Sequence, residues 1–431
     1  MDLTYGNRAN NFIRTLILFL FTNFCFAQTW SPVGDGMLGG YVNTMCVYDS
    51  ALYVGGTFIG PGSHIAEWNG NNWLGVGGGI NNDVYVLCAY KNNLYAGGYF
   101  SNAGGYSAGG FAEWSGANWN AVDPKFQHIV SAMDTSNNLL FYCDDLHGVY
   151  TWNGKVFQTV LYNTTNAIIN YNDTMYVTTL THGITSSGYY FIVAGSLYKI
   201  WPKVSSYQVK RIANFLSRSN ACNLYSLAVY NNKLYIGGSF DTVNHKIIHN
   251  LAVYNGSFFV PAGNINGTVN ALSVYNGKLY AGGYFDSVGT IPANNIACWN
   301  DTTWSALGEG VNNAVFSIVP FNGDLYVGGG FTEPGNYIAK YSLPKPDTTK
   351  HFNTIRIFPN PNKGLFSIGV PDNMVGSIMF IYNAFGQNMG EYSLKSNVTE
   401  LNMRGSSAGI YVYRINTNNG DKFTAGRFII Y

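Results

Sequence analysis

Short runs of alternating hydrophobic and polar residues fill most of the chain, and one run recurs at a regular interval. The heptapeptide LYAGGYF occupies residues 94–100 and again 279–285. Related runs are LYVGGTF, LYIGGSF and LYVGGGF, which begin at Leu52, Leu234 and Leu325. The five starts are 42, 140, 45 and 46 residues apart, so the long gap can hold two diverged copies. The candidates for them are LLFYC at 139–143 and MYVTT at 175–179.

Seven copies then recur with a mean period of about 45 residues, which is typical of a propeller or a solenoid. Each period contains four strand-like pieces, which in residues 84–122 read VYVLCAYKNN, LYAGGYF, GGFAEWSG and ANWNAV. Four short antiparallel strands form the blade of a β-propeller. An α-solenoid would need apolar residues at helical spacing, and the repeats lack that pattern. The paired glycines are interpreted as sites of close backbone approach, not as a phosphate-binding loop.

The two ends of the repeat region predict how the ring closes. The last repeat stops after Ile338–Tyr341 without a tryptophan-bearing fourth strand, whereas the segment TWSPVGDGM at 29–37 resembles TWSALGEGV at 303–311. We therefore expect Thr29–Val33 to complete the last blade, with Trp30 beside Ile338–Tyr341, which removes the free sheet edges. The predicted fold is an all-β, seven-bladed propeller of four-stranded blades over residues 28–343, with six or eight blades as alternatives.

The GG-aromatic repeat resembles Kelch-like and galactose-oxidase-like propellers, and more closely the secreted bacterial propellers with repeats of the type LYvGGxF…iAxWdG…W. The resemblance implies the architecture and says little about function, because propellers serve many unrelated tasks. No copper-ligand motif of galactose oxidase can be matched to this chain, so its cofactor is not expected here.

Composition changes at SLPKPDTTK, and residues 344–353 read as a linker. Residues 354–431 contain alternating strands separated by Asn and Gly turns, which predict a small antiparallel β-sandwich of the immunoglobulin-like kind. This C-terminal segment also resembles the type A C-terminal sorting domain of the type IX secretion system. The residues that carry the resemblance are Pro359, Asn360, Pro361, Gly364, Phe366, Gly409 and Tyr411, followed by a terminal apolar strand.

The resemblance implies that the type IX machinery recognises the domain at the outer membrane of a Gram-negative bacterium, after Sec export through the periplasm. The protein would then be released or held on the cell surface. The alternative is an immunoglobulin-like accessory domain without a sorting role.

Residues 1–27 read as a secretory signal. Arg8 and Arg14 precede the apolar run TLILFLFTNF, and Ala27 is followed by Gln28 at the expected cleavage site. A transmembrane anchor would need about 18 or more apolar residues, so the run is too short, and no other segment of the chain is long enough.

Composition narrows the chemistry further. Only 10% of the 431 residues are charged and the formal net charge is +1, which gives no electrostatic basis for binding nucleic acid. Cys46, Cys88, Cys143, Cys222 and Cys298 remain after signal removal, and an odd number favours unpaired thiols. His245 and His249 are four residues apart in a loop, with no acidic ligand expected beside them. We therefore predict no metal, no cofactor and no catalytic residue.

The residues leave three functions open. The first is a non-catalytic binding or adhesion module for glycan or protein. The second is an extracellular carbohydrate-active enzyme, which would need two carboxylates within about 5–10 Å at one end of the ring. The third is a structural protein of the cell envelope. In addition, the segment THGITSSGYYF lengthens the fourth repeat, and we expect a longer projecting loop there.

Overall fold

The computed structural model describes residues 29–342 apart from 124–127, 145–147, 155–156, 163–164, 173, 185–189, 204–205 and 218–221, and residues 354–430 apart from 359, 361, 363, 404 and 417–422. The chain divides into two compact units, with the boundary between residues 343 and 344. The predicted signal peptide, including its Ala27–Gln28 cleavage site, and the whole predicted linker lie outside the described residues.

Within the described part of the first unit, seven antiparallel sheets contain the strands in the order of the repeats. Sheet 1 contains β2 (Val42–Tyr48), β3 (Ala51–Gly56), β4 (Ile65–Trp68) and β5 (Trp73–Gly75). Sheet 2 contains β6 (Val84–Tyr90), β7 (Asn93–Gly98), β10 (Phe111–Trp114) and β11 (Trp119–Ala121). Sheet 3 contains β12 (Val130–Ser136), β13 (Leu139–Asp144), β14 (Val149–Trp152) and β15 (Phe157–Leu161). Sheet 4 contains β16 (Thr165–Tyr171), β17 (Thr174–Ile184), β18 (Tyr190–Lys203) and β19 (Ser206–Leu216), extended by β22 (Thr242–Val243) and β23 (Lys246–Ile247).

The remaining sheets follow the same plan. Sheet 5 contains β20 (Asn223–Tyr230), β21 (Lys233–Ser239), β24 (Leu251–Tyr254) and β25 (Phe259–Pro261). Sheet 6 contains β26 (Thr268–Tyr275), β27 (Lys278–Tyr284), β30 (Ile296–Trp299) and β31 (Trp304–Ala306). Sheet 7 contains β32 (Val315–Phe321), β33 (Asp324–Gly329), β34 (Ile338–Tyr341) and β1 (Trp30–Pro32). Two small hairpins are β8 (Asn102–Ala103) with β9 (Tyr106–Ser107), and β28 (Ser287–Val288) with β29 (Ile291–Pro292).

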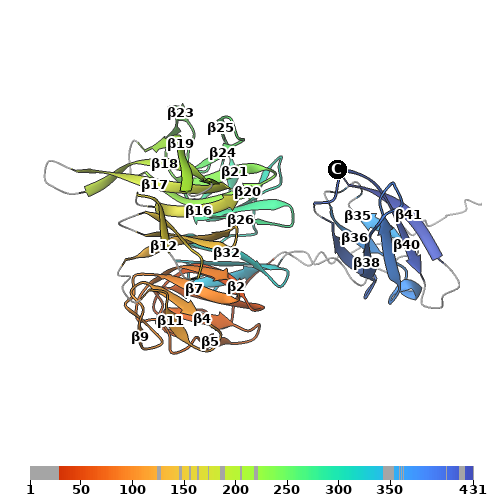
Figure 1. Ribbon diagram of the computed structural model, residues 1–431, viewed down its shortest axis with the longest axis horizontal. Helices are drawn as coiled ribbons and strands as arrows, with labels where there is room; N and C mark the ends of the chain where they lie inside the picture. The colour runs from red at the N-terminus through yellow and green to blue at the C-terminus, as the bar shows by residue number, and fades with distance from the viewer. Residues whose placement is uncertain are drawn as a thin grey trace, which may run out of the picture. The chain divides into compact units, whose positions relative to one another are not determined.

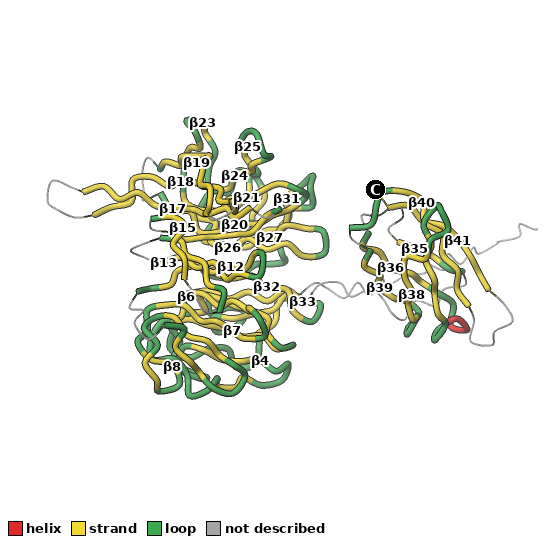
Figure 2. Tube along the Cα trace, viewed as in Figure 1, coloured by secondary structure: helices red, strands yellow, loops and turns green. Residues whose placement is uncertain are grey.

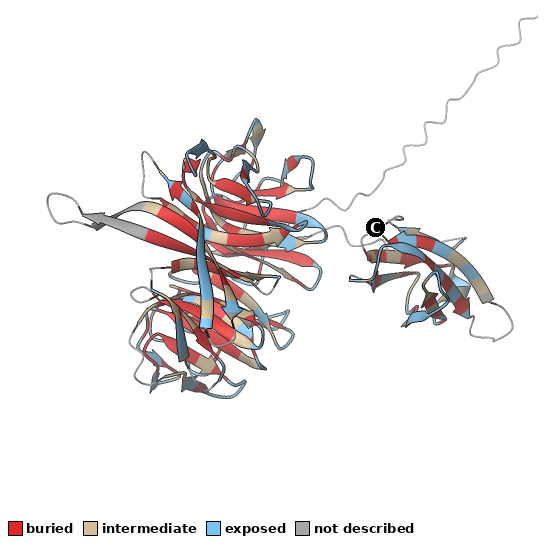
Figure 3. Cartoon of the chain, turned by 45° about the horizontal axis from the view of Figure 1, so that its top comes forward, coloured by how far each residue is buried: buried red, intermediate tan, exposed pale blue. Residues whose placement is uncertain are grey.

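The first strands of the seven sheets contact one another in a closed cycle, β2–β6–β12–β16–β20–β26–β32 and back to β2. Figure 2 shows the strands of this unit joined by loops at their ends. In five of the seven sheets the second strand carries the LYxGG motif, and β3 is buried throughout. Figure 3 shows buried residues, in red, along the strands of this unit. The apolar residues of the repeat therefore fill the wedge between neighbouring sheets, in line with the all-β prediction.

The paired glycines allow neighbouring sheets to approach. A Cβ on Gly97 would lie 2.6 Å from Val130 Cγ1 in the first strand of the next sheet. A Cβ on Gly98 would overlap the carbonyl oxygen of Asp83 in its own sheet. Gly328, in the last sheet, approaches Val42 of the first sheet in the same way as Gly97 approaches Val130. The repeated GG is thus a packing requirement of this backbone.

Two sheets have lost this glycine pair. In β13 the register places Cys143 and Asp144 where Gly97 and Gly98 stand in β7. In β17 the register places Thr178 and Thr179 at these positions. Both sheets contain the motif copies expected at 139–143 and 175–179, and all four substituted side chains are buried.

The lengthened fourth repeat differs from the expected loop. Its residues extend the β17–β18 hairpin, whose register runs out to Ile184 and Tyr190 (Figure 1). The alternation of Thr, His, Ile, Tyr and Phe in this segment sustains strand pairing, because β-branched and aromatic residues fit an extended backbone. The prediction of a loop was therefore wrong for the described part of this segment.

The second unit contains two antiparallel sheets that share one core. The first consists of β35 (Arg356–Phe358), β36 (Leu365–Gly369) and β39 (Val398–Asn402), and the second of β37 (Ile378–Tyr382), β38 (Asn388–Ser393), β40 (Gly409–Asn416) and β41 (Phe423–Ile430). Phe366 and Leu401 from one sheet pack with Met379, Ile415 and Phe428 from the other. A 3-10 turn, η1 (Asp372–Met374), is the one helical element among the described residues, and they contain no helix that could cross a bilayer.

Candidate functional sites

Every first strand in the ring of sheets carries a β-bulge at the same position. The register skips one residue near the start of each strand. Such bulges redirect a side chain out of the ladder and often lie beside functional sites. The seven bulged residues, called the bulge ring here, are Asn43, Tyr85, Ser131, Asn166, Tyr225, Asn270 and Phe316.

Three short polar members of the bulge ring link neighbouring sheets. Asn43 Nδ2 donates a hydrogen bond to the carbonyl oxygen of Val84 at 3.1 Å. Asn270 Nδ2 donates to the carbonyl oxygen of Val315 at 3.3 Å. Ser131 Oγ donates to the carbonyl oxygen of Thr165 at 2.7 Å. In each case the acceptor directly precedes the bulged residue of the next sheet, so a polar residue here has a structural role.

Aromatic residues occupy three of the seven positions, where the fold would accept the short polar residue. Tyr85 is 37% exposed and Tyr225 is 39% exposed, while Phe316 is partly buried and lies 6.2 Å from the Tyr41 ring between centroids. Burial raises the pKa of the Tyr85 and Tyr225 phenols above the ordinary value, and the Asp83 carboxylate adds to the shift at Tyr85. Both phenols are therefore neutral at physiological pH and partly exposed.

A second set of residues, called the rim, flanks the bulge ring at the same end of the strands. Each sheet contributes two residues to it. One stands two positions before the bulged residue, and the other directly follows the glycine pair or the two residues that replace it. Within each sheet that keeps the glycine pair, these two residues are joined by a backbone hydrogen bond or by strand pairing. Three rim tyrosines are well exposed, namely Tyr41 (48%), Tyr99 (57%) and Tyr284 (65%). Among the described members of ring and rim, Asp83 alone carries a formal charge at pH 7.

The seam between the last sheet and the N-terminal strand is the third feature. β1 pairs antiparallel with β34, with Trp30 opposite Tyr341 and Pro32 opposite Ala339, so Ile338 follows directly along β34. Trp30 Nε1 donates to the carbonyl oxygen of Leu307 at 2.7 Å. The same indole-to-carbonyl bond recurs within the continuous repeats, from Trp73 to Val33, Trp119 to Val76 and Trp304 to Ala262.

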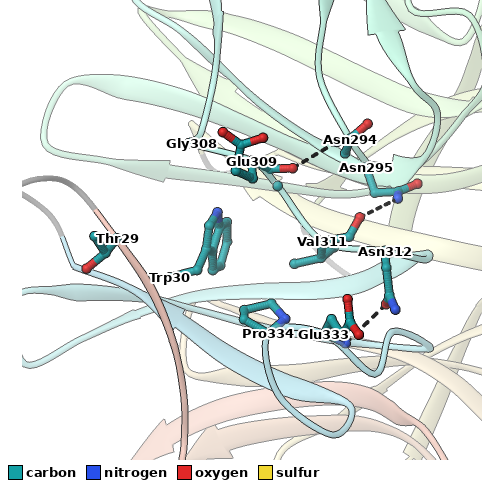
Figure 4. A pocket seen from close by; sticks show the side chains of 11 residues that line it. Thr29, Trp30, Asn294, Asn295, Gly308, Glu309, Val311, Asn312, Glu333 and Pro334 are labelled. Atoms are coloured by element: carbon teal, nitrogen blue, oxygen red, sulfur yellow. Dashed lines mark hydrogen bonds between the residues drawn. The ribbon is translucent and has the colours of Figure 1, made fainter.

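A pocket of about 890 Å³ opens at this seam (Figure 4). Its walls include Trp30 and two carboxylates, Glu309 and Glu333. Asn294 Nδ2 donates to the carbonyl oxygen of Glu309 at 2.9 Å, and the backbone N–H of Glu333 donates to Asn312 Oδ1 at 3.2 Å. The pocket, called the seam pocket here, lies beside the outer strand, so it is distinct from the bulge ring.

The predicted sorting residues come together at the end of the terminal strand. Asn360 Oδ1 accepts a hydrogen bond from the Ile429 backbone N–H at 3.0 Å, and the Asn362 N–H donates to the Ile429 carbonyl oxygen at 2.9 Å. The Phe366 and Tyr411 rings lie 4.6 and 5.6 Å from the Phe428 ring between centroids. The motif and the last strand, far apart in sequence, therefore form one structural cluster.

The remaining sorting residues differ in what the structure says of them. Gly364 has φ of +84°, a conformation that favours glycine, and its N–H donates to Asn362 Oδ1 at 2.8 Å. Gly409 is exposed, and a Cβ added to it would meet nothing within 4 Å, so packing does not require a glycine there. Pro359 and Pro361 lie outside the described residues.

The cysteine prediction is confirmed, because all five thiols are free. Burial raises the pKa of Cys46 to about 11, so that thiol is protonated and unreactive at neutral pH. The expectation that no acid accompanies the two loop histidines was wrong, since His249 Nδ1 lies 3.4 Å from Asp241 Oδ1. Even so, the described residues contain no group of three or more His, Cys, Asp or Glu that could hold a metal ion.

Sequence reasoning missed the bulge ring and a repeated asparagine. Asn81, Asn266 and Asn312 follow the outer strand, and each Oδ1 accepts two backbone N–H groups from the loop after the glycine pair. The signal for these was the recurring Gly-x-Gly-Ile/Val-Asn in GGGIN and GEGVN. The signal for the bulge ring was a polar or aromatic residue directly after a Val or Leu near the start of six first strands, with Thr165 in place of the Val or Leu in the seventh.

Comparison with solved structures gives distant similarity. PorZ, an essential bacterial surface component of the type IX secretion system of Porphyromonas gingivalis, is 14% identical with a TM-score of 0.48, over 93% of this chain and 60% of that one. The extracellular domain of a putative one component system from B. thetaiotaomicron is 11% identical with a TM-score of 0.48, over 94% and 58%. YCF48 bound to D1 peptide is 12% identical with a TM-score of 0.43, over 73% and 97%.

The chain therefore spans about three fifths of the length of the first two of these proteins. No curated protein matches the chain. Residues 356–431 match the family described as the secretion system C-terminal sorting domain. This segment is therefore a secretion system C-terminal sorting domain, as its motif predicted, and it indicates export through the type IX secretion system to the cell surface or the medium.

Proposed function

We propose that the protein is an exported, non-catalytic binding module whose ligand site is the bulge ring of a seven-bladed β-propeller. In this proposal Trp30–Pro32 closes the ring against Ile338–Tyr341, and the sorting unit is an immunoglobulin-like sandwich that follows a linker at 344–353. The N-terminal segment directs Sec export and is removed after Ala27. The propeller then reaches the surface or the medium, where it binds glycan or protein, and no cofactor takes part.

The observation that carries the binding role is the aromatic substitution at three equivalent positions. Four members of the bulge ring are short and polar, and three of these are seen to link sheets. Tyr85 and Tyr225, at two of the other three positions, are 37% and 39% exposed. Phe316, at the third, is partly buried beside the Tyr41 ring, so the two tyrosines carry the binding role. Exposed aromatic side chains that are not needed for packing are typical of binding surfaces.

The ring positions supply their own matched variants. Tyr85→Asn, Tyr225→Asn and Phe316→Asn each install a residue that sister sheets already use at that position, with Val130, Val269 and Val42 as the expected carbonyl partners. The triple variant should fold with an unchanged melting temperature and lose binding to ligands identified on glycan and peptide arrays. Phe258→Asn, in the exposed turn between β24 and β25, serves as the control. Full retention of every array signal by the triple variant would contradict a ligand site at the ring.

The export half of the proposal predicts the behaviour of a chain truncated after residue 343. This variant should keep the folded propeller but accumulate inside the cell envelope, because it lacks the sorting domain. Fractionation and immunoblotting of cells and medium measure the distribution. Phe385→Ala in the full chain is the control, since this side chain is 90% exposed and packs in no core. Arrival of the truncated chain at the surface would rule out the sorting role.

One observation favours a second function, a carbohydrate-active enzyme. Glu309 and Glu333 line the same pocket, as an acid and a base in glycoside hydrolysis would. If this function holds, the protein releases reducing ends from a polysaccharide, and Glu309→Gln and Glu333→Gln each lower the rate by about 100-fold or more. Asp83→Asn is the control, because it removes a carboxylate outside the seam pocket. Equal rates in all variants, or none in the wild type, exclude the enzyme.

A further inference from the structure

The charge pattern around the bulge ring narrows the class of ligand. No described member of the ring is charged, and Asp83 is the one charged residue of the described rim. Acidic polysaccharides and nucleic acids require Lys or Arg to balance their charge, and the described ring and rim contain neither. Among the described members of ring and rim, Asp83 alone could pair with a cationic ligand. The surface is therefore complementary to a ligand without net charge.

The side chains that line this surface are amphipathic. Tyr85 and Tyr225 offer an aromatic face and a neutral hydroxyl group, and the rim adds Tyr41, Tyr99 and Tyr284. Tyrosine supplies a rigid apolar face and a hydrogen-bonding tip at a small cost in side-chain entropy. The asparagine amides of the ring donate their Nδ2 hydrogens to neighbouring sheets, which orients the side chains and leaves Oδ1 as an additional acceptor. Sugar rings present apolar C–H faces and many hydroxyl groups, which match this combination.

The three aromatic positions are spread around the cycle. Tyr85 belongs to sheet 2, Tyr225 to sheet 5 and Phe316 to sheet 7. A chain of linked sugars can contact aromatic residues of several sheets at once.

We infer that the bulge ring binds an uncharged polysaccharide chain, whose sugar rings stack on Tyr85 and Tyr225 and extend over the rim tyrosines. This inference rests on the proposed function, because it names the ligand of the same site. It goes beyond that function in excluding charged polymers and in predicting which solution conditions leave binding unchanged.

The experiment uses the full-length secreted protein and titrates it with two groups of polymers. The neutral group is mannan, xylan and a mixed-linkage glucan, and the acidic group is polygalacturonate and chondroitin sulfate. We expect binding within the neutral group, with a Kd that changes less than twofold between 50 and 500 mM NaCl, because no counterions are released. Tyr85→Asn or Tyr225→Asn should weaken binding about tenfold each. Phe258→Asn, which lies outside the ring and the rim, should change the Kd less than twofold.

The outcomes separate the inference from the proposal beneath it. Binding confined to the acidic group, or a Kd that rises steeply with salt, overturns the uncharged polysaccharide while a ligand site at the ring stands. Absence of binding to any neutral polymer also overturns it, as does peptide binding that the same tyrosine variants abolish. Glycan binding that survives both tyrosine variants overturns the ring as the site, and the proposed function with it. Circular dichroism melting curves of each variant verify that a lost signal does not reflect unfolding.

Discussion

Replacing Gly328 with alanine is expected to destabilise the first unit by about 3 kcal/mol, at the upper end of the usual cost of overpacking. A Cβ on this residue would overlap Val42 Cγ1 and lie 2.9 Å from Val42 Cβ, in the contact that joins the last sheet to the first. The Val42 side chain is fully buried, so it cannot move away from the added methyl group. Thermal unfolding followed by circular dichroism should show a melting temperature lower by about 6 °C or more.

The control lies two residues further along the chain. A Cβ on Gly330 would meet the Phe316 ring at 3.7 Å and the Tyr41 ring at 3.8 Å, both ordinary contacts. Gly330→Ala should therefore leave the melting temperature within about 1 °C of the wild type. The two variants carry the same substitution, one inside β33 and one directly after it, so a difference between them reports the inter-sheet contact. Equal melting temperatures would show that the first and last sheets do not pack closely in solution.

Much of the architecture was readable because the repeat carries its own packing rule. LYxGG places apolar residues and a glycine pair on the second strand. The first glycine faces the next sheet and the second faces the backbone of its own sheet, so five intact copies predict five strands with equivalent packing. The copies that begin at Leu139 and Met175 were predicted from the repeat period, because their residues no longer match the motif. Cys143 and Thr178 show that a sheet can tolerate a small buried side chain at the first glycine position.

The candidate site was much less visible. A β-bulge depends on how two strands pair, and no run of residues along one strand reveals which position the partner skips. Tyr85 reads in sequence as one more aromatic residue of an amphipathic strand, and only its register against β7 separates it from the core. The same limit applies to the seam pocket, since Trp30 and Glu309 are separated by nearly the whole propeller in sequence. The long β17–β18 hairpin was missed because turn-like residues such as Gly183 outweighed the strand formers around them.

Replacing Trp30 with alanine should open the seam between β1 and β34. The change removes the indole bond to Leu307 and the contact with Tyr341, whose ring lies 4.9 Å away, at an expected cost of about 3 kcal/mol. β1 has three residues and pairs with β34 alone, so without its indole we expect the strand to detach and leave the backbone of β34 exposed. Hydrogen exchange measured by mass spectrometry should then show rapid exchange at Ile338–Tyr341.

Trp304→Ala is the matched control for this experiment. It breaks the same kind of bond, from the indole to the carbonyl oxygen of Ala262 at 2.7 Å, but within a sheet whose outer strand follows its neighbour in the chain. That strand is held by the chain at both ends, so its loss of packing should lower the melting temperature without opening β34. Slow exchange at Ile338–Tyr341 in both variants would mean that β1 does not hold the ring of sheets closed. The packing of the first strands against one another would then have to close it. Rapid exchange in the Trp30 variant alone would assign closure to the N-terminal strand, because that strand can leave its sheet without unfolding a neighbouring repeat.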